Sequence, residues 1–400
     1  MRSHWTYLLL TTLAACFGFV GCEKKFDLAV LPNPGQPSAI GDTNYVEILP
    51  PLGGFESPRG MMIGNDQLIY VTDYDRNELV MMDAGGTVLK RRSIPHPTVV
   101  AQNTKLDLYV GGETVAPNGI DTIGAIYRIY LVRFDTSYVS RIDTVINSST
   151  GDTTISVVRR DTSYFFNHDL EHAPMRRVWD EAARPPRRFT GIAVFPDNDY
   201  LVTRTGPDNS SFVDPDCRVL YFNKHDVFVT PLGDLVTRPS GGTAVTDIRN
   251  LTGIMIFPSS RDFVLTQNSE GVSYGAIWMI YQSTPDFQGW LPRFDPTKPD
   301  QRGVDFIRAG RFSNAAGIAY DKRRREIFIV DSELDSVVKF DRNGRFRRES
   351  FGRHKTASDQ FRGLDTPGGI AFSNDCTLYV ADTGNKVIRR FRLSTQTQCN

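Results

Sequence analysis

The residues best placed to do chemistry in this chain lie at the ends of short apolar runs. Six runs, LIYVTD, LYVGG, YLVTR, FVLTQ, IFIVD and LYVAD, end in turn at Asp73, Gly112, Arg204, Gln267, Asp331 and Asp382. Carboxylate, guanidinium and amide groups could together hold a polar ligand if the fold brings the ends of these runs to one place. The candidate ligand-binding residues are therefore Asp73, Arg204, Gln267, Asp331 and Asp382.

A structural role competes with ligand binding at these positions. An Asp that ends an apolar run commonly accepts hydrogen bonds from the backbone amides of the turn that follows. We favour that interpretation for Asp331 and Asp382. Arg204 and Gln267 break the pattern in adjacent units, which makes them the better candidates for binding.

The histidines give little support to catalysis. His168 and His172 are four residues apart, a spacing that could chelate zinc on a helix, but no third ligand is evident nearby and we favour a solvated loop. No G-x-S-x-G, Walker, C-x-x-C or H-E-x-x-H pattern occurs. We expect no catalytic residue, no metal site and no cofactor. The remaining histidines of the mature chain, which share no common position, are His96, His225 and His354.

The pattern that contains these run ends recurs along the chain. A Gly with apolar residues after it is followed by a turn, by the apolar run with its polar end, by a second turn and by a third run. The anchoring glycines are Gly60, Gly191, Gly253, Gly317 and Gly369. The first spacing is about twice the next two, and TVVA, KLDLYVGGE and GAIYRIYLVRFD fill the gap. The sequence therefore contains six copies.

Six copies of three readable strands, each with room for a fourth, predict an all-β fold, a six-bladed β-propeller of four-stranded antiparallel blades. A ring of blades buries both faces of every sheet, which explains why LIYV, IFIV and LYVA are nearly continuous apolar runs. The last copy ends after its third strand, at about Leu393, while residues 43–51 have strand character and no blade of their own. We expect this N-terminal strand to close the last blade.

The last copy also carries a family resemblance. TPGGIAFSNDCTLYVADTGNKVIRRF resembles an NHL repeat, with matches at Pro367, Gly369, Ile370, Ala371, Tyr379, Val380, Ala381, Asp382, Gly384, Asn385, Ile388 and Phe391. The copies at Gly60 and Gly317 match in part, and the family's usual Arg at the start of the third strand is replaced by Glu78, Ser336 and Val387. The resemblance implies a propeller but no one chemistry, because NHL and related propellers include protein-binding and RNA-binding modules, sensors, lyases and lactonases.

The N-terminus indicates export and lipidation. Residue 2 is Arg, residues 5–20 are apolar, and Glu-Lys-Lys follows Cys22. This layout resembles a bacterial lipoprotein signal in residues 1–21, with Cys22 as the acylated residue and Cys16 as the alternative. Pro-rich residues 22–42 would form a flexible tether, and residues 43–400 the propeller. Because Glu rather than Asp follows Cys22, the resemblance favours a lipid anchor in the outer membrane of the cell envelope.

The mature chain leaves three cysteines if Cys22 carries lipid. In an oxidising compartment we prefer a disulfide between Cys376 and Cys399, which would pin the tail to the last blade. Cys217 would then be a buried free thiol.

Residues 130–166 form an excursion longer than a blade needs. DTSY occurs twice around the turn signal NSSTGD, which predicts a long hairpin. Such a hairpin commonly covers a propeller face or contacts a partner.

The charge balance limits the partners. Lys plus Arg and Asp plus Glu are 46 each, so no net field draws the protein to nucleic acid, and the runs KRR at 90–92 and RRR at 323–325 are expected to keep exposed segments soluble. Our leading hypothesis is a membrane-tethered extracytoplasmic module that binds a protein, peptide or glycan without catalysis. The alternative is a metal-dependent hydrolase or lyase of the lactonase kind that uses the central channel.

Overall fold

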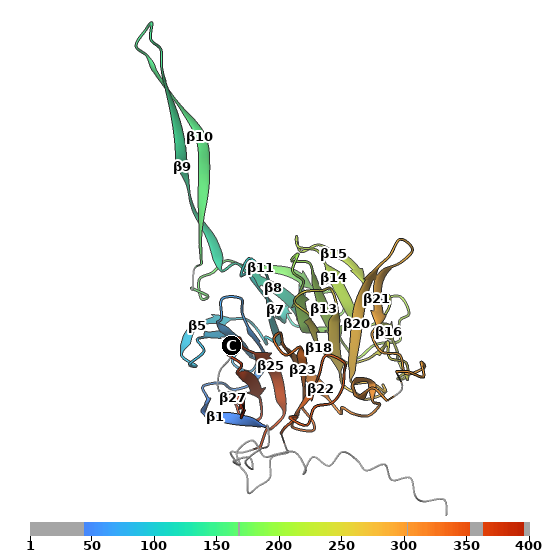
Figure 1. Ribbon diagram of the computed structural model, residues 1–400. Coiled ribbons are helices and arrows are strands. Elements are labelled where there is room, and N and C mark those ends of the chain that lie inside the picture. The colour runs from blue at the N-terminus through green and yellow to red at the C-terminus, as the bar shows by residue number, and fades with distance from the viewer. Residues whose placement is uncertain (1–43, 167–168, 302, 353–362, 396–400) are drawn as a thin grey trace, which may run out of the picture.

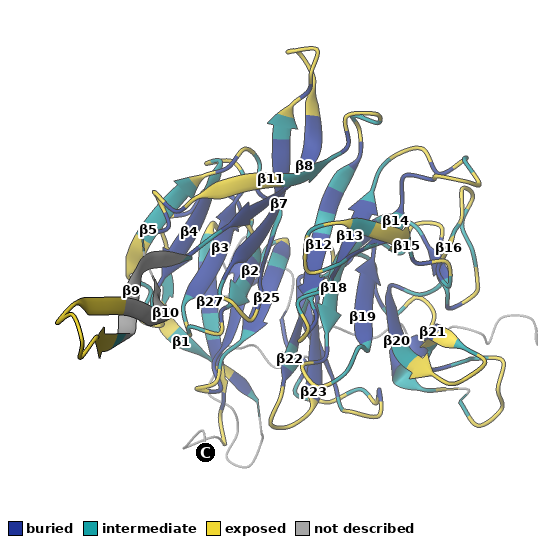
Figure 2. Cartoon of the chain, turned by 90° about the horizontal axis from the view of Figure 1, so that it is seen from above, coloured by how far each residue is buried: buried dark blue, intermediate teal, exposed yellow. Residues whose placement is uncertain are grey.

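Six small antiparallel sheets form a ring in the computed structural model, which confirms the all-β, six-bladed propeller (Figures 1 and 2). The structure describes residues 44–166, 169–301, 303–352 and 363–395, with the backbone alone over 133–142 and 156–166. In the described part, no helix is long and apolar enough to cross a membrane.

The first three blades follow in chain order. Blade 1 comprises β2 (Pro58–Ile63), β3 (Ile69–Asp73), β4 (Glu78–Met82) and β5 (Val88–Ser93). Blade 2 comprises β6 (Val99–Gln102), β7 (Leu108–Val115), β8 (Thr122–Ile129) and β11 (Met175–Asp180). Blade 3 comprises β12 (Arg188–Val194), β13 (Tyr200–Thr205), β14 (Arg218–Phe222) and β15 (Phe228–Pro231).

The other three blades complete the ring. Blade 4 comprises β18 (Leu251–Ile256), β19 (Phe263–Gln267), β20 (Ala276–Ser283) and β21 (Gln288–Pro292). Blade 5 comprises β22 (Ala315–Asp321), β23 (Glu326–Asp331) and β24 (Ser336–Phe340). Blade 6 comprises β25 (Pro367–Phe372), β26 (Leu378–Asp382), β27 (Val387–Leu393) and β1 (Tyr45–Leu52). Between blades lie the short parallel pair β16 (Val236–Thr237) and β17 (Asp247–Ile248) and the 3-10 turn η2 (Asp305–Ile307).

The N-terminal strand closes the ring, as predicted. β1 pairs antiparallel with β27, with Tyr45 opposite Leu393 and Ile48 opposite Arg390. Tyr45 is buried and its ring contacts Phe328 of blade 5 at a centroid distance of 5.7 Å. The first strand therefore joins blade 6 and also seals it against its neighbour.

Blade 5 departs from the predicted four strands. Among the described residues its sheet has three, and the outer edge of β24 is met by isolated bridges from Phe346 and Phe351 rather than by a strand. The Val337 amide and carbonyl exchange hydrogen bonds of 2.7 and 3.0 Å with Phe351. The fourth strand is thus replaced by an irregular segment that still pairs part of the edge.

The hydrophobic core lies between the blades. Every residue of β3, β19 and β23 is buried (Figure 2), and so is every residue of β26, which accounts for their continuous apolar sequences. Aromatic rings join neighbouring blades, such as Tyr109 and Tyr200, whose centroids are 4.6 Å apart. Each fully buried large apolar side chain contributes about 1.5–3 kcal/mol relative to exposure, so the interfaces supply most of the stability.

The recurring glycines allow the inner strands to approach one another around the channel. A Cβ on Gly60 would lie 2.5 Å from the Thr98 carbonyl oxygen, and one on Gly317 would lie 2.5 Å from that of Gly368. Both of those oxygens belong to the next blade in the ring. Glycine at these positions therefore lets neighbouring inner strands pack closely at the channel wall, and any side chain there would push two blades apart.

The predicted long hairpin stands out from the ring. β9 (Val132–Ile146) and β10 (Thr153–Phe166) pair from Val132 with Phe166 to Ile146 with Thr153 and project away from the blades (Figure 1). We name this hairpin the arm. It is inserted between β8 and β11, the third and fourth strands of blade 2.

The strand order defines two faces of the propeller. In an antiparallel blade, the turn between the first and second strands and the turn between the third and fourth lie at one edge. The arm leaves from that edge, which we name the arm face. The second strands end at the opposite edge, where the chain enters each inner strand, and we name this the mouth face.

Candidate functional site

The candidate residues lie at the mouth face, and their side chains bond the protein's own backbone. Asp73 is fully buried and accepts hydrogen bonds from the amides of Glu56 at 3.0 Å and Ser57 at 2.7 Å. These amides immediately precede β2, the inner strand of the same blade. The carboxylate thus fastens the end of the second strand to the chain entering the first.

Asp331 makes the same connection in blade 5 with more partners. It accepts hydrogen bonds from the amides of Ser313 (2.7 Å) and Asn314 (3.2 Å), which precede β22. The amides of Glu333 and Leu334 in the following turn donate to it as well, at 3.1 and 3.0 Å. The hydrogen bonds to backbone amides that the sequence analysis favoured for Asp331 are therefore present.

Asp382 repeats the connection in blade 6 with a buried cation beside it. It accepts hydrogen bonds from the Asp365 amide at 2.8 Å and from the Asn385 side chain at 2.8 Å. Arg389 Nε lies 2.7 Å from its Oδ2, and both side chains are almost fully buried. Burial raises the pKa of Asp382 to about 6, and the attraction of Arg389 offsets only part of that effect.

Gln267 serves blade 4 through its amide. Its Oε1 accepts a hydrogen bond of 2.8 Å from the Arg249 amide, and its Nε2 donates to the carbonyl oxygens of Asp247 (3.1 Å) and Tyr274 (2.7 Å). It is fully buried. A neutral amide can therefore replace the carboxylate.

Arg204 performs the role in blade 3 through shared carboxylates. It donates to the Pro215 carbonyl at 2.7 Å and forms ion pairs with Glu181 at 3.1 Å and Asp214 at 2.7 Å. Arg187, which precedes β12, pairs with the same two carboxylates at 3.1 and 2.8 Å. Burial would raise the pKa of Asp214, but its hydrogen bonds with the two arginines hold that pKa below its ordinary value.

None of the five candidates lines either of the two described pockets. Each is bonded to neighbouring groups of the protein, so a ligand would have to displace these partners to reach them. Ligand binding by these five residues stays a prediction.

Blade 2 has Gly112 at the equivalent position, and here the structure contains a group that sequence reasoning missed. The Glu113 amide donates to the Pro95 carbonyl at 2.8 Å, so the backbone itself makes the connection. The Glu113 carboxylate lies 3.0 Å from His96 Nδ1 and 2.7 Å from Arg188 Nε. Burial would raise the pKa of Glu113, but the hydrogen bonds from His96 and Arg188 lower it below its ordinary value.

His96 is presented to solvent at the mouth face. Its side chain is 40% exposed and its ring stacks on Tyr74 at a centroid distance of 4.7 Å. Arg59 lies 3.5 Å from the Tyr74 ring. Together these groups could bind a carboxylate or transfer a proton. His96 lies in the link between two blades and has no equivalent position in the repeat, so the sequence pattern did not single it out. Its backbone has a positive φ of 41°.

The described residues contain one group of three potential metal ligands, and it lies away from the mouth. Asp169, Glu171 and His172 follow the arm and are half-buried or exposed. Asp169 Oδ2 is 2.8 Å from His172 Nδ1, and Lys90 lies 3.5 Å from the other oxygen. This arrangement suits a surface network of ion pairs. His168 lies outside the described residues.

The cysteines agree with the sequence where the structure describes them. Cys376 is disulfide-bonded, and its predicted partner Cys399 lies outside the described residues. Cys217 is a buried free thiol, as predicted, and burial raises its pKa to about 11. Cys16 and Cys22 also lie outside the described residues.

The chain is similar in fold to solved propellers of unlike activity. A gluconolactonase from Xanthomonas campestris matches with a TM-score of 0.50 and 12% identity, over 88% of this chain and 90% of that one. A luciferin-regenerating enzyme matches at 0.51 and 9%, over 88% and 95%. An auxiliary nutrient binding protein from Bacteroides thetaiotaomicron matches at 0.50 and 10%, over 85% and 70%.

These likenesses show the fold alone, because the identities are low and the proteins include both enzymes and a binding protein. No protein-family model matches the chain, and no curated protein matches its sequence. The resemblance to NHL repeats therefore stays a prediction.

The raised pKa of Asp382 makes stability depend on pH. With a pKa of about 6 when folded and about 3.9 when unfolded, the carboxyl contributes most to stability below about pH 4, and that contribution is lost as the pH rises through 6. We expect the free energy of unfolding of the wild type, relative to Asp382→Asn, to fall by on the order of 2 kcal/mol between pH 4 and 7 in urea titrations. The same titration of Asp75→Asn, at an exposed position, is the control for an Asp-to-Asn change outside the core. A difference that does not change with pH would contradict the raised pKa.

Proposed function

We propose that this protein is a membrane-tethered, extracytoplasmic propeller that binds a protein partner through the arm and carries out no chemistry. The single observation behind the proposal is the arm itself. A closed ring of blades does not need it, and it is built from two paired strands rather than loop. The known propellers of similar fold do not decide between binding and catalysis.

The arm is long enough to contact a partner at a distance from the propeller. β9 and β10 have 15 and 14 residues, and a strand of that length extends about 45 Å. Their sheet is two-stranded in the described part of the chain, so each strand has one edge that no described strand covers. Such edges are suited to adding a strand from another chain.

The tip of the arm supports the same proposal. Val145, Ile146 and Ile155 are 63, 66 and 65% exposed. Ile146 pairs with Thr153 and Ile155 with Thr144, which places the two isoleucines on the same face of the hairpin. Neighbouring exposed apolar side chains at the end of a projecting element are typical of a contact surface, and they fit an apolar groove on a protein.

A metal-dependent hydrolase or lyase at the mouth is the second candidate. The observation in its favour is His96, which is oriented by Glu113 and flanked by Arg188 and Arg59. Among the described residues, however, no three metal ligands gather there. Binding through the arm has the more direct support.

The lipid anchor belongs to the proposal because residues 1–43 lie outside the described part. We expect Cys22→Ser to abolish labelling by radioactive palmitate and to release the protein from the membrane fraction, because no other thiol follows the signal closely. The control Cys16→Ser should keep the label. Loss of labelling in Cys16→Ser alone would place the anchor at the other cysteine, and labelling in neither wild type nor variants would overturn the tether.

Arm binding can be tested by photo-crosslinking in intact cells. A photoreactive amino acid at Val145 should give one discrete crosslinked protein, whereas one at the equally apolar Phe212, 96% exposed at the mouth face, should not. The double variant Ile146→Asp, Ile155→Asp should lose the product. Its melting temperature should match the wild type, because exposed substitutions change stability by about 0.5 kcal/mol or less.

Two results would contradict the arm as the binding element. One is the same product from Val145 and Phe212, which would indicate proximity without specificity. The other is a product at Val145 that persists at full yield in the double Asp variant.

A further inference from the structure

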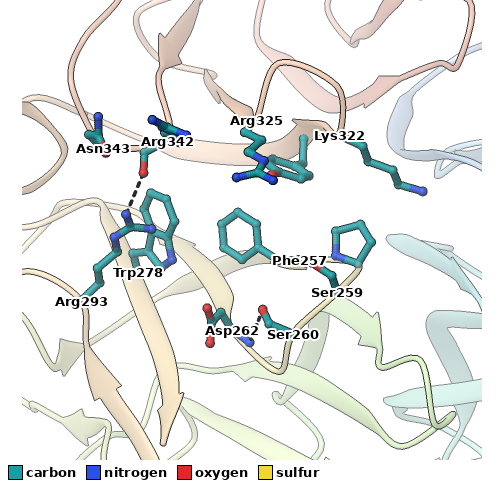
Figure 3. Close-up of a pocket in the computed structure, with 12 residues that line it drawn as sticks. Phe257, Ser259, Ser260, Asp262, Trp278, Arg293, Lys322, Arg325, Arg342 and Asn343 are labelled. Atoms are coloured by element: carbon teal, nitrogen blue, oxygen red, sulfur yellow. Dashed lines mark hydrogen bonds between the residues drawn. The ribbon is translucent and has the colours of Figure 1, made fainter.

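A cleft of about 550 Å³ opens on the arm face between blades 4 and 5, on other blades than the arm (Figure 3). Its walls come from three turns that are distant in sequence and from the outer part of blade 4. The turns are residues 257–262 between β18 and β19, residues 320–325 at the end of β22, and residues 342–343 after β24, and blade 4 adds Trp278 of β20 and Arg293 after β21. The volume falls within the roughly 300–1,000 Å³ of small-molecule sites.

The cleft concentrates positive charge in a protein whose net charge is zero. Four cations line it and a single carboxylate, Asp262, opposes them. Asp262 is already engaged, since its Oδ1 accepts a hydrogen bond of 2.8 Å from the Tyr281 amide. In the described part of the chain none of the four cations forms an ion pair. The cations are Arg293, Lys322, Arg325 and Arg342.

Arg293 is positioned at the wall of this cleft by two contacts. Its guanidinium lies 3.9 Å from the centre of the Trp278 ring, and its Nη2 donates a hydrogen bond of 2.7 Å to the Arg342 carbonyl (Figure 3). It is half-buried, and burial lowers its pKa. A guanidinium carries five N–H donors, so most of those of Arg293 have no described partner. An anion would supply both the missing charge and the missing acceptors.

A second donor lies in the lining without a partner. Trp278 is only 4% exposed, and its indole N–H has no hydrogen-bond acceptor among the described residues. A buried donor without an acceptor costs about 1–3 kcal/mol. The lining of the cleft also includes the hydroxyl groups of Ser259 and Ser260 and the amide of Asn343.

The aromatic lining gives the cleft an apolar floor rather than a stacking platform. The Phe257 and Trp278 rings stack on each other at 4.9 Å, and Tyr320 meets Phe257 edge-on at 4.9 Å. Arg293 lies against the Trp278 ring as well. A ligand would therefore be recognised by its charges and hydrogen-bond acceptors at the rim.

We propose that this cleft binds a small ligand that carries two or more anionic groups, such as an acidic oligosaccharide with carboxylate, sulfate or phosphate substituents. Arg325 and Arg342 lie on turns of blade 5, and Arg293 lies opposite them on blade 4 (Figure 3). A ligand bound between the two blades would therefore meet cations on both sides. The planar fork of Arg matches the geometry of carboxylate, sulfate and phosphate. This site goes beyond the proposed function and does not depend on the arm.

Calorimetric titration tests the site with defined probes. Trigalacturonate, sulfated trisaccharide and inorganic pyrophosphate represent the three anion chemistries, and maltotriose is the neutral control. We expect at least one anion to bind with a Kd below about 1 mM in 20 mM NaCl, more weakly in 200 mM NaCl because salt screens exposed charges. Maltotriose should give no heat.

Two variants and a matched control locate the binding. Arg325→Gln and Arg342→Gln remove exposed cations that line the cleft, and each should weaken the anion at least tenfold. Arg345→Gln removes an exposed cation from the same turn as Arg342 that does not line the cleft, and it should leave the affinity unchanged. Superimposable melting curves will show that all three variants fold.

The proposal is overturned if no anion binds with a Kd below about 1 mM, or if the three variants weaken binding equally, which would indicate a general attraction to surface charge. The Ile146→Asp, Ile155→Asp arm variant should bind the anion as the wild type does. Failure of the arm proposal and failure of the cleft proposal are thereby distinguishable.

Discussion

The fold depends on one connection that recurs in every blade: a group at the end of the second strand bonds the chain that enters the inner strand. That chain is buried at the mouth face and its amides need acceptors, because an unsatisfied buried amide costs about 1–3 kcal/mol. Asp73, Asp331 and Asp382 supply a carboxylate. Blade 4 uses the Gln267 amide, and blade 3 uses Arg204 with carboxylates shared by Arg187. One geometric requirement is thus met by several chemistries.

This connection also explains where function can arise. The polar groups at the second-strand ends connect the strands within each blade, and the glycines of the inner strands let neighbouring blades pack closely around the channel. Features that occur in one blade only are not needed to connect the strands or to let the inner strands approach one another. The arm belongs to blade 2 alone, His96 to the link before it, and the cationic cleft to the turns of blades 4 and 5. We therefore propose binding roles for the arm and the cationic cleft, which are not part of the repeating unit.

Sequence periodicity predicted the ring, its closure by the first strand and the long hairpin, because each follows from local strand pattern and spacing. It did not predict the partners of Arg204, since Glu181 and Asp214 come from loops without a repeat position. The cleft was equally hidden. Arg325 belongs to a run of three arginines that suggested only solubility, and its companions Arg293 and Arg342 are brought near it by packing between blades.

The most direct test of the recurring connection is the free energy of unfolding of Asp331→Ala, measured by urea denaturation beside Glu333→Ala. Asp331 serves four backbone amides in a fully buried position, whereas the neighbouring Glu333 side chain bonds the Ser313 hydroxyl at the surface. The account predicts that Asp331→Ala loses about 3 kcal/mol or more, and that Glu333→Ala loses less than about 1 kcal/mol. Equal stability of Asp331→Ala and the wild type would contradict it, and would return the second-strand residues to the role of ligand-binding groups.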